Sequence, residues 1–121
     1  MHPEEETTRN EVVVRGRLSA PAEERELPSG DVVVTLRVIV SRARPRGPSA
    51  RSKQRFDVID CAVWAARLRR TVRAWRAGDV VEVEGALRRR FYRGAAGTTS
   101  RVEVEAARAR RISAAVPASA S

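Results

Sequence analysis

The chain has few of the residues that build active sites and covalent cross-links. Its 121 residues include one cysteine, Cys61, and one histidine, His2. A single cysteine excludes an intramolecular disulfide, and neither a histidine-based triad nor a zinc site can be assembled from these two residues. Asp57 and Asp60 lie three apart on a predicted strand, so they point to opposite faces and form no paired-carboxylate centre. Because no G-x-x-x-x-G-K-[ST] phosphate loop is present either, we expect a protein that is not an enzyme and that holds no metal or cofactor.

Lysine is also scarce, although positive charge is not. Of the 24 basic residues only Lys53 is a lysine, and with 15 acidic residues the formal net charge is +9. The planar guanidinium group of arginine can grip phosphate in two places and can stack on a base. Codon bias in a GC-rich genome could replace lysine by arginine, but it would not by itself produce this net charge. The charge balance therefore favours a polyanionic partner.

Long apolar runs are missing as well. The first nine residues are acidic and polar, so no secretory signal is predicted, and no run approaches the roughly 20 apolar residues of a membrane-spanning helix. The length fits one domain. Polar composition without periodicity predicts disordered ends at residues 1–9 and 113–121, which leaves one ordered domain over residues 10–112.

Within this domain the apolar pattern predicts an all-β fold with one short helix. Alternation of apolar residues predicts strands, and apolar residues at helical spacing, with Trp75 on the core side, predict a helix over 65–75. The predicted strands are 12–18, 32–40, 56–64, 79–92 and 101–106, with a turn over 94–100. Three strands, a helix and two strands is the order of the OB-fold, a five-stranded, partly open Greek-key barrel whose second and third strands bind oligonucleotides.

Aromatic and arginine side chains on these strands are the candidate binding residues. A sequence-tolerant single-strand binder needs a positive groove and exposed aromatic faces for base stacking. Arg88, Arg90 and Tyr92 lie two apart and so project from one face of their strand. Trp64 and Phe56 lie on the strand face opposite to Ile59, Cys61 and Val63; for both aromatics, core packing remains an alternative.

A basic loop adds to this set. Residues 43–53 contain Pro and Gly and, with Arg42 and Arg55, carry six basic residues and no acidic one. Between the second and third strands of an OB-fold, such a loop would overhang the binding face. The arginines of the helix are interpreted first as its solvated side. The predicted nucleic-acid-binding residues are Trp64, Tyr92, Phe56, Arg37, Arg42, Arg44, Arg46, Arg51, Lys53, Arg55, Arg88 and Arg90.

Three segments, in this order and spacing, resemble the bacterial single-stranded DNA-binding protein family from Asn10 to Ile112. They read N-E-V-V-V-R-G-R-L, F-D-V-I-D-C-A-V-W and R-A-G-D-V-V-E-V-E-G-A-L-R-R-R. The resemblance implies an OB-fold that coats single-stranded DNA in replication, repair or recombination. It further implies a homo-oligomer, a tetramer with a dimer as the alternative, in the bacterial cytoplasm at the nucleoid. By position, Trp64 and Tyr92 coincide with aromatic places on which the family stacks bases.

The sequence also departs from the family's pattern. One usual stacking aromatic is replaced by the stretch from Arg42 to Arg44, and another falls at Val58, with Phe56 two residues earlier on the same face. The chain ends in SAAVPASAS, which predicts a short, accessory-type member without the acidic C-terminal tip and without tail-mediated recruitment of replication proteins. Two other interpretations stay open. One is an RNA-binding or ribosome-associated OB module, because stacking does not distinguish the sugars. The other is an OB-fold adaptor for protein partners, in which the excess of arginine reflects codon bias alone.

Overall fold

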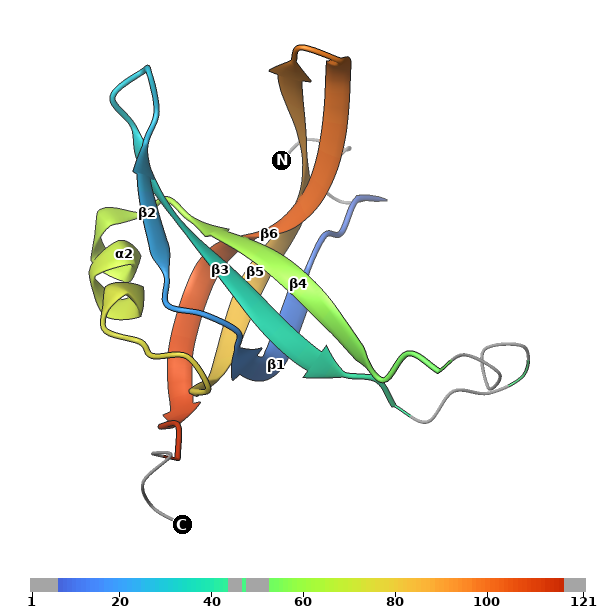
Figure 1. Ribbon diagram of the computed structural model, residues 1–121, viewed down its shortest axis with the longest axis vertical. Coiled ribbons are helices and arrows are strands. Elements are labelled where there is room, and N and C mark those ends of the chain that lie inside the picture. The colour runs from blue at the N-terminus through green and yellow to red at the C-terminus, as the bar shows by residue number, and fades with distance from the viewer. Residues whose placement is uncertain (1–6, 44–46, 48–52, 117–121) are drawn as a thin grey trace.

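The computed structural model describes residues 7–43, 47 and 53–116, and this part of the chain is rich in strands (Figure 1). In chain order its elements are β1 (Val12–Leu18), β2 (Glu23–Glu26), β3 (Val32–Ser41), β4 (Phe56–Val63), α2 (Ala66–Arg73), β5 (Val80–Gly94) and β6 (Gly97–Ser113). The predicted all-β class with one short helix is confirmed. The short strand β2 was not predicted, because its sequence E-E-R-E lacks apolar alternation; it pairs with β3 at the edge of the sheet.

The strands close into a ring. The sheet order is β1-β5-β6-β4-β3-β2, and β1 pairs with β3 as well. This closing contact consists of two residue pairs, Arg17 with Ile39 and Leu18 with Val38. The contact between β4 and β6 is parallel, and the other pairs of neighbours are antiparallel. Such closure leaves β3 and β4, the second and third strands of the OB-fold, side by side over eight residue pairs.

Two glycines allow the strands of the ring to cross closely. A Cβ atom on Gly16 of β1 would lie 2.0 Å from the carbonyl oxygen of Ile39, and one on Gly85 of β5 would lie 1.9 Å from that of Glu105. Neither position can hold a side chain without movement of the backbone. Gly85 also adjoins a register shift between β5 and β6, so the strong bend of this hairpin begins here.

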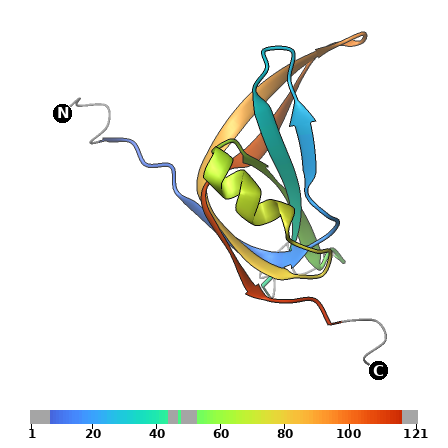
Figure 2. The ribbon, with the colours of Figure 1, turned by 90° about the vertical axis from the view of Figure 1, so that its left-hand side faces the viewer.

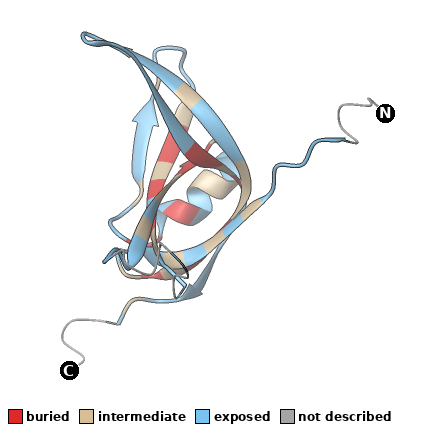
Figure 3. Cartoon of the chain, turned by 90° about the vertical axis from the view of Figure 1, so that its right-hand side faces the viewer, coloured by how far each residue is buried: buried red, intermediate tan, exposed pale blue. Residues whose placement is uncertain are grey.

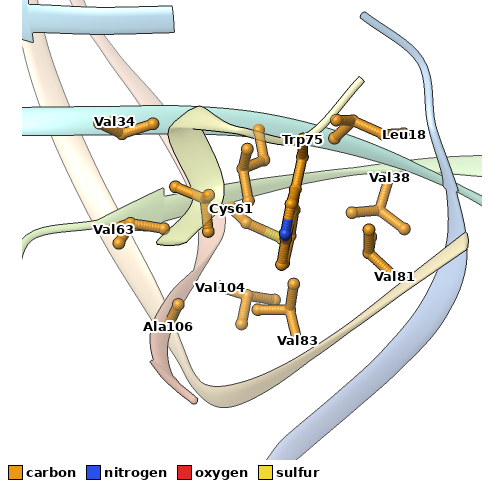
Figure 4. Packing of buried hydrophobic residues seen from close by; sticks show 12 residues of the cluster. Leu18, Val34, Val38, Cys61, Val63, Trp75, Val81, Val83, Val104 and Ala106 are labelled. Carbon is orange, nitrogen blue, oxygen red and sulfur yellow. The ribbon is translucent and has the colours of Figure 1, made fainter. Parts of the chain in front are cut away.

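The core fills the ring beneath α2, as Figures 3 and 4 show. Its members are Leu18, Val34, Leu36, Val38, Cys61, Val63, Val72, Trp75, Val81, Val83, Val104 and Ala106. Trp75 is only 5% exposed and contributes the largest ring, so its predicted core role is confirmed. Cys61 and Val63 are buried and Ile59 packs against them, as predicted for that face of β4. Burial, with Asp60 and Glu103 nearby, raises the pKa of the Cys61 thiol to about 12, so this thiol stays protonated and unreactive.

Helix α2 covers one end of the ring (Figure 2) and is joined to β5 by a connection centred on a buried carboxylate. Asp79 is 1% exposed. Its two oxygens accept backbone N–H bonds from Arg76 at 2.8 Å and from Ala115 at 2.7 Å. The bond from Arg76, then that from Ala115, lowers the pKa of this carboxyl against the opposing effect of burial. Asp79 therefore fastens the end of the helix to the segment that follows β6.

The ends of the domain lie close to the predicted boundaries. Strand β6 runs to Ser113, one residue beyond the predicted limit, and the bonded Ala115 lies beyond it. Residues 1–6 and 117–121, which the sequence predicts to be disordered, lie outside the described residues. Over the residues that are described, no helix has the length and apolar character needed to cross a membrane.

Beyond the ring, β5 and β6 continue as a long two-stranded hairpin, here called the arm, which projects at the top of Figure 1. Pairing extends to Gly94 opposite Gly97. The predicted turn over residues 94–100 is therefore wrong, since β6 begins at Gly97. Thr98, Thr99 and Ser100 fit a strand, but without apolar alternation they give no strand pattern in the sequence.

Candidate nucleic-acid interface

The outer face of β3 and β4 carries two of the predicted binding residues, Phe56 and Arg37. Phe56 and Val58 of β4 are both more than half exposed, and Val58 lies opposite Ile39 of β3. The next pair on this face is Arg37 opposite Asp60, whose side chains form an ion pair at 3.2 Å. Phe56 thus lies on an apolar, solvent-facing surface beside charged groups, as its alternation predicts. An aromatic ring held there is available for stacking.

A groove of about 820 Å³ adjoins this face. Its walls are the connection from β1 to β2, strand β2, the middle of β3 and β4, and the arm; in Figure 1 the hairpin of β2 and β3 and the arm rise on either side of it. Arg37 and Tyr92, both predicted, line the groove. Arg25 and Arg101 line it as well and were missed. Only the hairpin register, in which Tyr92 lies opposite Thr99, could have placed Arg101 beside the ring of Tyr92.

Trp64 lies directly after β4 and is half-buried under an arginine of the arm. The guanidinium carbon of Arg90 lies 5.3 Å from the centre of the Trp64 ring, within the range of a cation–π contact. Arg90 is itself held by two carboxylates, since it donates to Glu103 at 2.9 Å and to Glu105 at 3.1 Å. The buried Trp64 Nε1 has no hydrogen-bond partner among the described residues. The ring is therefore neither a core residue like Trp75 nor freely exposed, and it is presented on the same side as the arm's arginines.

Tyr92 repeats this arrangement nearer the tip of the arm. Its side chain is 39% exposed, and the guanidinium carbon of Arg101 lies 5.8 Å from the centre of its ring. Arg101 forms no ion pair with the described residues, so its charge is available to a ligand. A ring with an adjacent guanidinium group can stack a base and contact its phosphate at the same place.

Most of the predicted arginines that the structure describes on β3 and β5, or directly after β3, already have a carboxylate partner. Arg42 grips Asp57 with two N–H groups, at 2.9 and 3.1 Å, and Arg88 pairs with Glu105 at 3.1 Å. The hydrogen bond from Arg42 lowers the pKa of Asp57, which stays ionised at neutral pH. The sequence did not predict these pairs, because the partners come from different strands. They offset much of the positive charge that composition places here.

The basic loop is described at its flanks and at Gly47. Lys53 is exposed, and Arg42 and Arg55 are joined by a backbone hydrogen bond of 2.8 Å that closes the base of the loop. The predicted loop residues Arg44, Arg46 and Arg51 lie outside the described residues.

Comparison with known protein sequences agrees with this geometry. A single-stranded DNA-binding protein of Listeria innocua is 32% identical over 85 residues, which cover 70% of this chain and 51% of that protein. The single-stranded DNA-binding protein of Bacillus cereus is 28% identical over 88 residues, 73% of this chain and 50% of that protein. The chain thus spans about half the length of these curated relatives.

Solved structures share the fold. The SSB of Plasmodium falciparum in complex with ssDNA superposes with a TM-score of 0.68 at 19% identity, over 88% of this chain and 96% of that one. A deletion mutant of the single-stranded DNA-binding protein from Thermus aquaticus gives a TM-score of 0.63 at 23% identity, over 90% of this chain and 43% of that one. The sequence matches the single-strand binding protein family over residues 9–112, so the chain belongs to that family.

Proposed function

We propose that this protein binds single-stranded DNA without sequence preference, by base stacking and phosphate contact, and that it catalyses no reaction. The observation that carries the proposal is the repeated pairing of an accessible aromatic ring with a guanidinium group, Trp64 with Arg90 and Tyr92 with Arg101. Tyr92 and Arg101 line the groove, and Arg90, two residues before Tyr92, projects from the same face of β5. Membership of the family supports the choice of ligand. Phe56 and Arg37 extend the surface along β3 and β4, and Arg42 follows at the end of β3.

The cellular setting follows from the family. We propose a homo-oligomer, a tetramer rather than a dimer, that coats DNA strands exposed in replication, repair or recombination in a bacterial cytoplasm at the nucleoid. Sedimentation velocity at several protein concentrations would give the oligomeric state. A domain over residues 10–112 is expected to carry the binding by itself, because every residue of the proposed surface lies within it.

The test is a titration with oligo-dT followed by tryptophan fluorescence. Because Trp75 is buried in the core, the change should come from Trp64. Trp64→Ala and Tyr92→Ala, measured by the fluorescence anisotropy of a labelled oligo-dT because Trp64 is itself the reporter, should each weaken binding by about 1–3 kcal/mol in a protein that stays folded. Affinity should also fall with salt, since each phosphate contact on a single strand contributes a slope of roughly 0.7 in log K against log salt.

Three outcomes would contradict the proposal or a part of it. A flat salt dependence, or no binding of oligo-dT at low salt, would favour the protein adaptor. Competition by unlabelled RNA at concentrations below those required of DNA would favour the RNA-binding module. If Trp64→Ala unfolds the domain while the affinity per folded molecule is intact, Trp64 is a packing residue and the stacking surface lies elsewhere.

A further inference from the structure

The arm has a second face, opposite to the face that carries Tyr92. Side chains of paired strands alternate between the two faces of a hairpin, so Tyr92 and its neighbours two residues away share one face and Phe91 and its neighbours share the other. Phe91 lies opposite Ser100, and Arg89 lies opposite Val102. We call this second surface the back face. Its exposed residues are Leu87, Arg89, Phe91, Arg93, Thr98, Ser100 and Val102, while Val104, opposite Leu87, is buried in the core.

The back face exposes the most accessible aromatic ring of the described residues. Phe91 is 69% exposed, against 55% for Phe56 and 39% for Tyr92. Leu87 and Val102, on the same face, are each nearly half exposed. Together these side chains form an apolar strip along an arm that projects from the ring. Contiguous exposed apolar surface of this kind marks a binding site more often than it marks a plain surface.

The charges of the back face differ from those of the groove side. Arg89 and Arg93 flank Phe91 at two residues on either side, the same spacing that Arg90 has to Tyr92. Arg89 donates only to the neutral hydroxyl of Ser100, at 3.1 Å, and Arg93 has no ion pair within the described part of the chain. On the groove side, by contrast, Arg90 is neutralised by carboxylates of β6. No aspartate or glutamate stands among the seven residues of the back face.

This charge pattern indicates which kind of partner the back face binds. A second copy of the chain, packed symmetrically on the same face, would bring Arg89 and Arg93 of both copies together with no carboxylate between them. Like charges placed together at an interface are costly. A single-stranded nucleic acid supplies what this face lacks, namely flat bases for Phe91 and phosphates for the two arginines.

We propose that the back face of the arm is a second contact surface for single-stranded nucleic acid. On it, Phe91 stacks a base and Arg89 and Arg93 contact the phosphates on either side. The inference rests on the proposed function and extends the same strand beyond the groove. A strand that leaves the groove side near Tyr92 passes the tip of the arm at Gly94 to Gly97 and continues along the back face. Only a strand long enough to round the tip engages both faces.

Strand length therefore tests the inference. One OB-fold occupies about 4–16 nucleotides, so an oligo-dT of about 8 nucleotides probes the groove side alone, whereas one of about 40 nucleotides reaches both faces. Phe91→Ala should weaken binding of the long oligomer by about 5- to 150-fold, the ratio for loss of one stacked base, and should leave binding of the short oligomer unchanged. Tyr92→Ala should weaken binding of both oligomers.

A charge variant gives a second, independent measurement. Arg89→Gln with Arg93→Gln should reduce the salt slope for the long oligomer by about 0.7 for each phosphate that is no longer neutralised. The matched control is Arg67→Gln with Arg70→Gln, which makes the same change in net charge at two exposed positions of α2 and should reduce the slope less.

The outcomes separate this inference from the proposed function. If Tyr92→Ala weakens binding while Phe91→Ala and the Arg89 and Arg93 variant do not, the back face is not a binding surface and the proposed function stands. If no form of the protein binds oligo-dT, the proposed function itself fails. If Phe91→Ala lowers the oligomeric state in sedimentation velocity and leaves binding of the long oligomer intact, a second copy of the chain covers the back face and the inference is overturned.

Discussion

The two tryptophans mark two regions that the same ring of strands keeps apart. Trp75 lies in the core beneath α2, surrounded by valines and leucines that are almost fully buried. Trp64 lies at the end of β4, under a guanidinium group and next to the arm. In the first region the aromatic ring completes the packing. In the second region the ring of Trp64 lies under the guanidinium group of Arg90, which donates hydrogen bonds to the carboxylates of Glu103 and Glu105.

This difference separates stability from binding. Removing a core side chain leaves a cavity, which destabilises the whole domain. Removing a side chain from an exposed ion pair such as Arg37 with Asp60 costs the folded protein little, because surface ion pairs contribute little to stability. Variants of the two regions should therefore divide into those that change the free energy of unfolding and those that change the affinity for DNA.

The largest expected effect is in the core. Trp75→Ala should lower the free energy of unfolding by about 3–5 kcal/mol, because it empties the centre of the cluster in Figure 4. Unfolding by urea, followed by circular dichroism, measures the loss. Trp75→Phe, which keeps a ring in the site, is the control and should lose less. A Trp75→Ala protein that is as stable as the parent would show that the cavity collapses or that the ring is not central.

The carboxylate of Asp79 is the next test of the same region. Asp79→Ala leaves the N–H groups of Arg76 and Ala115 without their acceptor and should cost about 1–3 kcal/mol of stability. DNA affinity per folded molecule should not change, since Asp79 lies away from the groove. Urea midpoints of the parent and the variant at neutral pH provide the comparison.

The same carboxylate predicts a dependence on pH. The pKa of Asp79 is lowered in the folded protein from its ordinary value of 3.8. Its contribution to stability is therefore present above the pKa of the unfolded chain and is lost as the pH falls through the lowered, folded value. The difference between the parent and Asp79→Asn should shrink as the pH is lowered below about 4. A difference that stays constant with pH would assign the effect to packing alone.

The two regions differ in how much of their structure could be predicted from the sequence. The faces of β4 and the core position of Trp75 follow from periods of two and of 3.6 residues, which are local properties of the chain. Strand β2 forms by pairing with the edge of β3, and the long arm forms by pairing of β5 with β6. Neither pairing can be predicted from the residues of one strand alone. The same holds for the candidate site. Its exposed aromatics could be predicted, but the carboxylate that neutralises each arginine depends on strand register, as for Arg90 with Glu103.

Those carboxylates lead to the smallest expected effect, at two exposed ion pairs of β3 and β4, one on the outer face (Arg37 with Asp60) and one on the opposite face near the end of β3 (Arg42 with Asp57). Arg42 is held by Asp57 through two N–H groups and Arg37 by Asp60 through one, and both pairs are open to solvent. A carboxylate that accepts two parallel bonds from arginine occupies the place that a phosphate would take. Each arginine must therefore leave its partner before it can contact DNA. Asp57 and Asp60 lower the affinity by this competition and by repelling the phosphates.

Asp57→Asn and Asp60→Asn should consequently tighten the binding of oligo-dT, each by about two- to fivefold, the range expected of an exposed ion pair. The salt slope should steepen by up to about 0.7 for each arginine released. Glu11→Gln is the matched control, since it removes the carboxylate of another exposed arginine pair, with Arg9 at 2.8 Å, and changes the net charge equally. Tightening in all three variants would mean that net charge alone sets the affinity. Weaker binding in Asp57→Asn would show instead that the carboxylate orients Arg42 for the phosphate, and that its effect as a positioning group exceeds its effect as a competitor.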